Sequence, residues 1–362
     1  MDFGLSQDQV LLKDTLRRWL DAECPTSRVR TIMESASGHD PALWEALAGL
    51  GVTGLQIPVA HGGAGLELLD VAIAAEELGR AATPGPFLAT AVATAALIAS
   101  GNDAAQARWL PAVAGGTAIL TVALGEEGDE WDVARYATRA RGGALTGRKA
   151  LVPYAAIADA ILVAAQDDDG PGLWLVEHGA PGVAITPLGG IDLTRRVDVL
   201  DLKGAPAARI ASGRAAIDRA RDAGLVLVAA DAFGGASRCV EMTVRYALTR
   251  EQFGQPIGAF QAVKHQLADL VTDLEPALSL WWYAAHAYDH MSEQAARHAA
   301  IAKAHLTELY DRITRVATEL HGGIGFTWEY DLHLWFRRAV FDRAFLGTAA
   351  YHRRRAADLA GW

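Results

Sequence analysis

Hydrophobic and polar positions recur at helical spacing through the first third of the chain. Ser6 and Gln9 stand at the spacing of a capping box, and apolar residues then follow every three or four positions up to Leu20. Alanine-rich apolar stretches come next, and the last of them is expected to end at Leu110, because Pro111 cannot donate the next backbone hydrogen bond. The pattern predicts an all-helical first segment.

The pattern changes at Ala118, where short runs rich in β-branched residues begin. Runs such as AILTVAL and GVAITPL are separated by Gly, Pro and Asp, which is typical of strands joined by turns. The spacing predicts a small antiparallel β domain that ends near Ala211.

Long helices return after Ala216. Residues 225–249 are apolar nearly all round, which predicts an interior helix of a bundle, and residues 301–320 carry apolar positions at near-heptad spacing. The order is α, β, α, which gives an α+β fold class. The expected domains are an N-terminal α-helical domain over 1–117, a middle β domain over 118–212 and a C-terminal helical domain over 213–362.

A tight corner separates two of the long C-terminal segments. Residues 250–258, REQFGQPIG, carry glycines and a proline that interrupt the apolar periodicity, which predicts a helix, a turn and a second helix. Arg250 and Glu251 close the first segment, and Phe253 and Gln261 flank the turn. By spacing alone, this corner is either a capped helical hairpin with solvated charges or part of a catalytic or binding site.

Composition excludes several classes of function. The formal net charge of −10 and the pI near 5.6 argue against a nucleic-acid surface and against an anionic-membrane surface, since both require basic clusters. Neither a signal-peptide pattern nor an uninterrupted apolar run of membrane-spanning length is recognised, and Cys24 and Cys239 suit a reducing compartment. We therefore expect a cytoplasmic protein. The histidines between 286 and 305 lack a ligand pattern, so no metal site is expected.

Two long motifs resemble signatures of the acyl-CoA dehydrogenase family. REQFGQPIGAFQ, residues 250–261, is similar to the family's R-x-Q-F-G-x-P-I-x-x-F-Q pattern. ELHGGIGFTWEYDLHLWFRRA, residues 319–339, is similar to its Q-x-x-G-G-x-G stretch that ends in R-D-A, with Arg338 in place of the Asp. The resemblance covers essentially the whole chain and is weakest in the middle. It implies an N-terminal helical domain, a β domain and a C-terminal four-helix bundle.

The resemblance implies oxidation of an acyl-CoA thioester to its trans-2-enoyl product. A carboxylate removes the α-proton while the β-hydride passes to bound FAD. Most members place this Glu in a Y-E-G-T sequence, but this chain reads FLGT and has Leu346 there. A minority places the Glu on the bundle helix, which predicts Glu251 as the base. Leu346 is still expected to offer its backbone N–H to the thioester carbonyl, because that donor does not depend on the side chain.

The same resemblance assigns six residues to FAD. A guanidinium suits the cofactor pyrophosphate, and glycines allow the backbone to approach it closely. The matching positions are Arg250 at the pyrophosphate across a dimer interface, Phe253 and Gln261 beside it, Gly322 and Gly323 at the close approach, and Thr348 on the adenine side.

The middle of the chain departs from the family pattern. The family's T-E-P-x-x-G-S-D and W-I-T-N segments touch the isoalloxazine ring, but this chain has Gly125-Glu126-Glu127 and Leu151-Val152-Pro153 at those places. Glu319 also replaces the Gln before Gly-Gly, which puts a carboxylate near a cofactor phosphate. The expected flavin contacts are therefore incomplete.

Three hypotheses remain open. The leading one is a FAD-dependent acyl-CoA dehydrogenase with Glu251 as base and a branched or bulky acyl chain as substrate. Its expected partners are electron-transfer flavoprotein or a similar acceptor and further subunits in a homo- or heterotetramer built as a dimer of dimers. The second is a non-catalytic or half-site subunit of a heterotetrameric acyl-CoA dehydrogenase, and the third is a relative that oxidises something other than a CoA ester.

Overall fold

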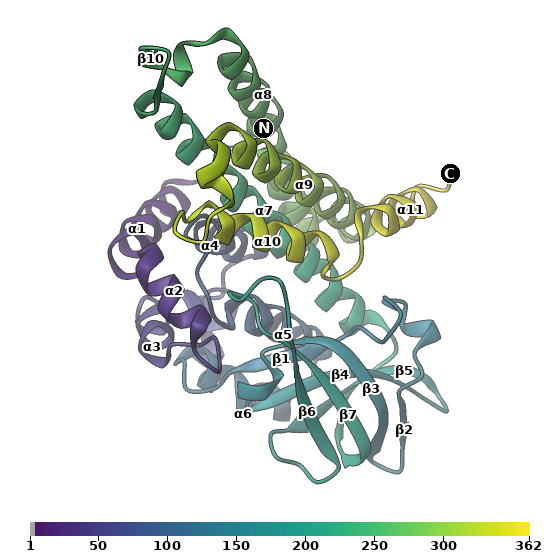
Figure 1. Cartoon of the computed structure of the whole chain (residues 1–362). Helices are drawn as coiled ribbons and strands as arrows, with labels where there is room; N and C mark the ends of the chain where they lie inside the picture. The colour runs from purple at the N-terminus through teal and green to yellow at the C-terminus, as the bar shows by residue number, and fades with distance from the viewer. Residues whose placement is uncertain (1–3) are drawn as a thin grey trace.

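The computed structural model describes residues 4–362, which form a helical layer, a β domain and a long helical bundle (Figure 1). The N-terminal helices are α1 (Gln7–Glu23), α2 (Thr26–Glu34), α3 (Pro41–Gly49), α4 (Leu68–Arg80), α5 (Phe87–Ser100) and α6 (Asp103–Ala114). Helix α1 begins with the predicted capping box, in which the Ser6 hydroxyl accepts from the Gln9 N–H and the Gln9 side chain accepts from the Ser6 N–H. The predicted helix end at Leu110 is wrong. Helix α6 continues through Pro111 because the buried Leu110 and Val113 keep its last turn packed.

The β domain is a mixed sheet rather than a purely antiparallel one. Its strands are β1 (Leu120–Ala123), β2 (Arg139–Arg141), β3 (Ala144–Pro153), β4 (Ala160–Asp167), β5 (Gly170–Glu177), β6 (Val183–Leu188), β7 (Val197–Pro206) and β8 (Ala208–Ser212). They follow the order β6-β7-β3-β2-β4-β5-β8, and β1 pairs with β4. Most neighbours are antiparallel, but β1 lies parallel to β4, with Leu120 opposite Ala160, and β2 meets β4 in parallel at one residue pair. The expectation of an antiparallel domain is therefore corrected for these pairs.

The C-terminal part is built around one helix. Its helices are α7 (Ala215–Thr249), α8 (Gln261–His290), α9 (Ser292–His321), α10 (Leu332–Ala344) and α11 (Ala349–Leu359), and a short hairpin of β9 (Glu251–Gln252) and β10 (Gln255–Pro256) joins α7 to α8. Helix α7 packs against α4, α5, α8, α9 and α10. It is long and apolar enough to cross a membrane, but 89% of its most apolar window is buried inside the protein. It is therefore the interior helix that the sequence pattern predicts.

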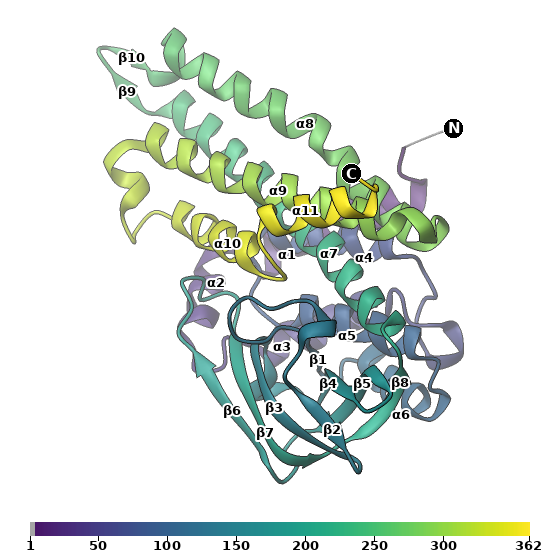
Figure 2. The same cartoon turned by 90° about the vertical axis from the view of Figure 1, so that its right-hand side faces the viewer.

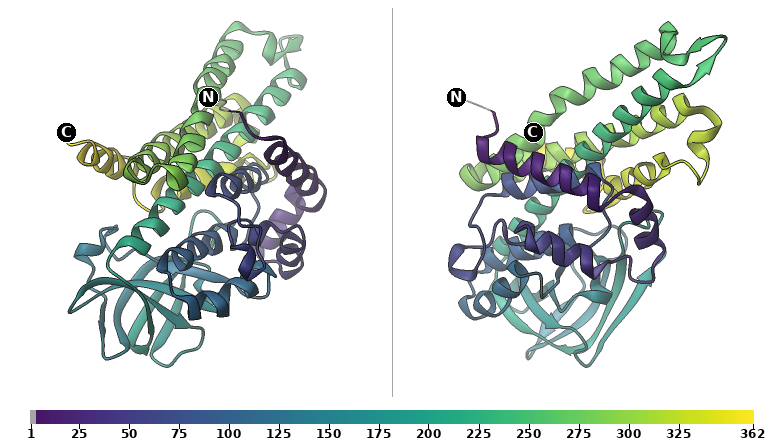
Figure 3. Two further views of the ribbon diagram at one scale, coloured as in Figure 1. Left: turned by 180° about the vertical axis from the view of Figure 1, so that it is seen from behind. Right: turned by 90° about the vertical axis from the view of Figure 1, so that its left-hand side faces the viewer.

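The α7–α8 hairpin projects away from the β domain, so the molecule has an inner and an outer end (Figures 1 and 2). Views from behind and from the side show the first helices, in purple, along one side of the molecule (Figure 3). Helix α4 packs on α7, and α5 packs between α7 and β1. Helices give way to strands between Ala114 and Leu120, and strands give way to helices between Ser212 and Ala215. The domain limits 1–117, 118–212 and 213–362 remain a prediction.

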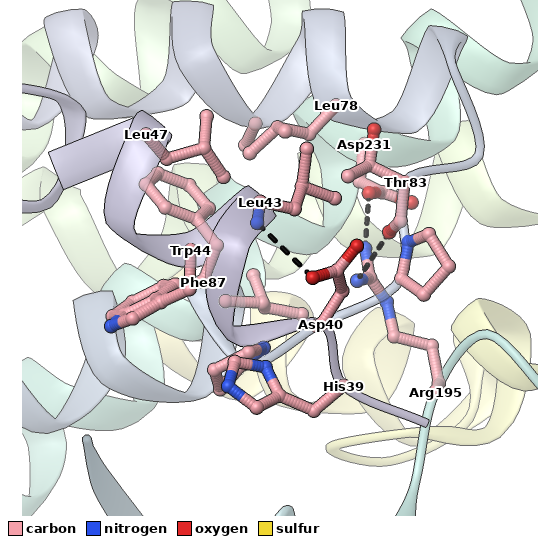
Figure 4. A pocket seen from close by; sticks show the side chains of 15 residues that line it. His39, Asp40, Leu43, Trp44, Leu47, Leu78, Thr83, Phe87, Arg195 and Asp231 are labelled. Atoms are coloured by element: carbon pink, nitrogen blue, oxygen red, sulfur yellow. Dashed lines mark hydrogen bonds and ion pairs between the residues drawn. The ribbon is translucent and has the colours of Figure 1, made fainter. Parts of the chain in front are cut away.

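A buried ionic cluster ties the three parts together. Arg195, from the loop before β7, donates to the Asp231 carboxylate of α7 at 2.5 Å, where helices α3, α4 and α7 meet the β domain (Figure 4). Arg338 of α10 is fully buried beside it and donates to the backbone carbonyls of Ala82 and Thr83. The arginine that replaces the motif Asp is therefore a structural residue, since buried charges require partners of this kind.

Candidate functional site

The turn between α10 and α11 carries the first predicted site residue. Leu346 is 3% exposed and adopts a left-handed backbone with φ of 60°, and Gly347 follows with φ of 102°. Two buried side chains hold this turn. His352 Nε2 lies 2.8 Å from the Leu346 carbonyl, and Lys303 Nζ donates to the Gly347 carbonyl at 3.1 Å. The Leu346 N–H makes no hydrogen bond with any residue between 4 and 362. It is therefore available as a donor.

Burial sets the protonation of both holding side chains. Lys303 is fully buried, and desolvation lowers its pKa to about 7, although nearby Asp342 acts in the opposite direction. Desolvation and the charge of Lys303 lower the pKa of His352 to about 3, so this imidazole is neutral at pH 7. A neutral His352 protonated at Nε2 donates one hydrogen bond to the Leu346 carbonyl.

An apolar pocket lies beside this turn, where the β domain meets α5. Its lining is Leu88, Ala89, Val92, Val122, Leu124, Trp131, Leu151, Pro153, Phe345 and Leu346. None of these side chains carries a carboxylate, and the pocket has room for about one water molecule. No side chain in this lining can therefore accept a proton.

The β-domain wall of the pocket departs from the family pattern in a structured way. Glu126 forms a buried ion pair with Lys149 at 2.8 Å and accepts hydrogen bonds from the N–H groups of Ala137 and Thr138. Burial alone would raise the pKa of Glu126, but Lys149 and these hydrogen bonds lower it, while burial lowers the pKa of Lys149 to about 8. Both groups are therefore charged and paired at pH 7. Glu126 is used to hold the loop and is not free for chemistry.

The second group of predicted residues lies at the outer end of the bundle (Figure 2). Arg250, Glu251 and Gln261 are exposed, and Phe253 is 93% exposed with φ of 53°. Within residues 4–362, the Arg250 guanidinium makes no hydrogen bond or ion pair. A cation and an aromatic ring are therefore both exposed on the surface of this chain.

The two predicted glycines lie at the same outer end. Tyr246, near the end of α7, stacks on His321, the last residue of α9, and the 3-10 turn η6 (Gly322–Phe326) begins directly after it. Gly322 has φ of 65°, which a glycine adopts without strain. A Cβ atom on Gly323 would meet nothing within 4 Å, so packing within this chain gives no reason for a glycine there. The assignment of Gly322 and Gly323 to the FAD site stays a prediction.

The prediction that Glu251 is the base at the Leu346 pocket is wrong within one chain. Leu346 packs against Gly224, since a Cβ there would meet Leu346 Cδ1 at 2.6 Å. Gly224 and Thr249 belong to the same helix and stand 25 residues apart (249 − 224), so about 38 Å of helix separates them. Glu251 lies beyond that far end and is exposed. The motif places it next to Arg250, and the length of α7 places it far from the pocket.

Thr348 has a structural role that the sequence interpretation missed. It is the N-cap of α11, and its hydroxyl accepts from the Tyr351 N–H at 3.3 Å. Its side chain is exposed, so a cofactor contact remains a prediction. Sequence reasoning also missed Trp131, Lys303 and His352. Only Trp131 gave a signal, because it stands inside the altered T-E-P-x-x-G-S-D segment.

No group of three or more His, Cys, Asp and Glu that could hold a metal ion occurs in residues 4–362. His286 and His290 lie near each other, and His290 contacts Glu67 at 2.9 Å, which accounts for that cluster as a surface pair.

Comparison with known proteins settles the family. The family model for the acyl-CoA dehydrogenase N-terminal domain matches residues 6–117, and the model for the C-terminal domain matches residues 207–360. The acyl-CoA dehydrogenase IpdE2 of Mycolicibacterium smegmatis is 33% identical over 355 residues, which cover 97% of this chain and 98% of the relative. The chain belongs to the acyl-CoA dehydrogenase family. These enzymes are FAD-dependent oxidoreductases that dehydrogenate acyl-CoA thioesters, which confirms the predicted reaction class and cofactor.

Further acyl-CoA dehydrogenases show the same likeness. FadE27 of Mycobacterium tuberculosis is 33% identical over 368 residues, covering 98% of this chain and 97% of the relative. The solved steroid acyl-CoA dehydrogenase variant Tcur3481-Tcur3483 is 35% identical with a TM-score of 0.91, covering 98% of each chain. A chain of the Mycobacterium tuberculosis ChsE4-ChsE5 complex is 29% identical with a TM-score of 0.90, covering 100% of this chain and 99% of that one. The predicted fold is confirmed.

The two ends of the molecule fit FAD unequally. The outer end offers an unpaired guanidinium, an exposed aromatic ring and an uncrowded glycine, which suit a pyrophosphate and a close backbone approach. The pocket at Leu346 offers no carboxylate or hydroxyl side chain in its lining and has space for about one water molecule, which does not fit a flavin ring.

Proposed function

We propose that this chain is one subunit of a two-chain acyl-CoA dehydrogenase. In this proposal its outer end completes the FAD site of a related partner chain, and the partner supplies the carboxylate that removes the α-proton. The assembly is a heterotetramer, built as a dimer of dimers. This differs from a homomeric enzyme in which every subunit holds its own base.

The observation that carries the proposal is Leu346. It stands where most of the family has the catalytic Glu, and it lies in a pocket whose lining contains no carboxylate. A hydrocarbon side chain cannot accept a proton. Since Glu251 lies at the other end of α7, the residues that the structure describes offer no second base for the same pocket. The proposal therefore assigns the carboxylate to another chain.

The outer end supports the complementary half of the proposal. Arg250 is exposed and unpaired, and its planar guanidinium can bind two phosphate oxygens at once. Phe253 and Gln261 flank it, and Gly322 and Gly323 lie nearby. This end keeps the family motif almost intact, whereas the pocket at Leu346 has neither a carboxylate nor a hydroxyl side chain in its lining.

Two of the solved relatives support a two-chain assembly through their names. One is described as Tcur3481-Tcur3483 and the other as the ChsE4-ChsE5 complex, so each description joins two protein names. Both resemble this chain over nearly its full length. A partner encoded as a separate acyl-CoA dehydrogenase chain is therefore the expected companion.

We propose a bulky acyl-CoA as the substrate of the assembly. The relative described as a steroid acyl-CoA dehydrogenase supports this proposal. Electron-transfer flavoprotein or a similar acceptor is the proposed oxidant, and a cytoplasmic location is retained as a prediction.

A panel of acyl-CoA thioesters tests the proposed substrate class. We expect turnover with a steroid side-chain thioester to exceed turnover with butyryl-CoA, and equal or reversed rates would contradict it.

Expression of the chain alone and together with its candidate partner tests the function. The lone chain should show no acyl-CoA-dependent dye reduction, and the co-purified pair should show it. The matched control is a pair in which this chain carries Gly49→Ala, whose added methyl group meets nothing within 4 Å. This variant should keep activity, because the proposal assigns no role to α3. Turnover by the lone wild-type chain would overturn the proposal.

A further inference from the structure

The inner pocket contains an indole where the family pattern has a small hydroxyl residue. In the T-E-P-x-x-G-S-D segment, counted from Gly125, Trp131 stands at the Ser position and Asp132 at the Asp position. This segment and the segment at Leu151 are the ones that touch the flavin ring in the family, and both contribute to the lining of one pocket here. The pocket is therefore this chain's counterpart of the ring seat.

The Trp131 side chain occupies this pocket and is held in place by its neighbours. Its side chain is 5% exposed and meets Phe345 edge to face, with ring centroids 6.2 Å apart. The indole N–H donates to the Asp129 carboxylate. A Cβ atom on Gly125 would lie 2.8 Å from the indole ring, so the glycine leaves the space that the indole occupies. An aromatic side chain held on several sides is part of the packed interior rather than a mobile cover.

Leu346 closes the opposite wall in the same manner. Its Cδ1 atom would lie 2.6 Å from a Cβ on Gly224 of α7, so this side chain also packs over a glycine. The loop that carries Trp131 is anchored at its base by Glu126, through the ion pair to Lys149 and the N–H groups of Ala137 and Thr138. With the indole and the leucine in place, room for about one water molecule remains.

We infer that Trp131 is a built-in plug that keeps this chain from holding a flavin ring in its own pocket. The inference rests on the proposed function, because a subunit that completes its partner's cofactor site has no need of a second ring. The inference also goes beyond the missing catalytic Glu at position 346. A chain that lacked only the Glu could still bind flavin unproductively, whereas a plugged chain leaves one ring for each pair of subunits.

Lumiflavin, which is the flavin ring system without ribityl phosphate, tests the pocket apart from the outer end. We expect the lone wild-type chain to leave lumiflavin fluorescence unquenched. Trp131→Ser, which restores the family residue, should bind lumiflavin about a hundredfold more tightly, because the indole no longer has to be displaced. Trp131→Phe is the matched control and should exclude the probe as the wild type does. Lumiflavin binding by the wild type, or a folded Trp131→Ser chain that still excludes it, would overturn the inference.

A second measurement covers the case in which Trp131→Ser fails to fold. The wild-type chain is labelled with 5-fluorotryptophan, and the Trp131 signal is assigned by its loss in Trp131→Phe. We expect this fluorine resonance to stay unchanged on adding lumiflavin, and a shift would contradict the plug. Different results contradict the two proposals. If the two-chain complex is active but the lone chain binds lumiflavin, only the inference about Trp131 is wrong. If the lone chain excludes lumiflavin but turns over substrate by itself, only the proposed two-chain function is wrong.

Discussion

Leu346 and Glu251 show how far a motif locates chemistry at the scale of a residue. The absence of a base at Leu346 can be predicted from the sequence, because the FLGT motif fixes that position. Whether Glu251 could act as the base instead could not be checked from the sequence. Its place in a motif does not give its distance from the pocket at Leu346. The 35-residue length of α7 decides that distance. Exposed residues at helix ends are therefore poor candidates for a base that requires desolvation.

The first residue-scale prediction concerns Glu251. Glu251→Gln in the two-chain enzyme should change turnover by less than about twofold, because the carboxylate takes no part in proton abstraction. The neighbouring Arg250→Lys is the matched comparison. It should weaken FAD binding about tenfold, since a lysine cannot bind two phosphate oxygens in a planar fork. Dye-reduction rates and FAD titration measure the two effects. Loss of turnover in Glu251→Gln with FAD retained would contradict this assignment.

Lys303 makes the second prediction at this scale. Burial lowers its folded-state pKa to about 7, while the unfolded chain retains an ordinary lysine pKa. Between these values the unfolded state binds more protons, so stability should rise with pH. Relative to Lys303→Met, the wild type should gain roughly 2 kcal/mol of unfolding free energy between pH 7 and 9. Urea unfolding at both pH values checks this, and parallel pH profiles for the two proteins would contradict it.

The burial of Lys303 could not be read from the sequence. It stands in the alanine-rich run AAIAKAHL, where a lysine normally faces solvent. Its surroundings come from the turn at Gly347, 44 residues later, whose carbonyl accepts from Lys303 Nζ. Local periodicity carries no information about a contact of that range.

At the scale of elements, caps and interior helices were predictable, and pairings between distant segments were not. The capping box at Ser6 and the buried face of α7 follow from local pattern. The parallel pairing of β1 with β4 depends on a crossover that strand propensity does not encode. Pro111 shows the same limit, since tertiary packing of α6 outweighs one lost backbone hydrogen bond.

The crossing of α4 and α7 yields a prediction about packing. A Cβ atom on Gly234 would lie 1.9 Å from the Glu76 carbonyl oxygen, so the two backbones must separate to admit it. Gly234→Ala should cost about 3 kcal/mol or more in unfolding free energy. Gly49→Ala in α3 is the control, because its Cβ would meet nothing within 4 Å. Denaturant unfolding of both variants tests the crossing, and equal stabilities would contradict it.

The turn after α9 yields a prediction that separates binding from stability. Gly323→Ala should leave the unfolding free energy within about 0.5 kcal/mol of the wild type, because the added methyl group meets open space. It should nevertheless weaken FAD binding to the two-chain complex, since the proposed cofactor site includes Gly323. Calorimetric unfolding and FAD titration are compared. Unchanged FAD affinity would remove Gly323 from the cofactor site.

At the scale of the whole molecule, the chain divides its roles between two ends. The outer end keeps the motif at Arg250, exposed and unpaired, and the inner pocket is closed by Trp131 and Leu346. The family and its three-part fold were predictable from two motifs and the α, β, α order. The unequal state of the two ends was not, because it depends on which side chains occupy a space that the sequence does not describe.

The flavin content of the purified proteins tests this division most directly. The lone chain should be colourless, and the complex with its partner should carry one FAD for every two chains, measured by flavin absorbance against protein concentration and by native mass spectrometry. One FAD for each copy of the lone chain would contradict the account.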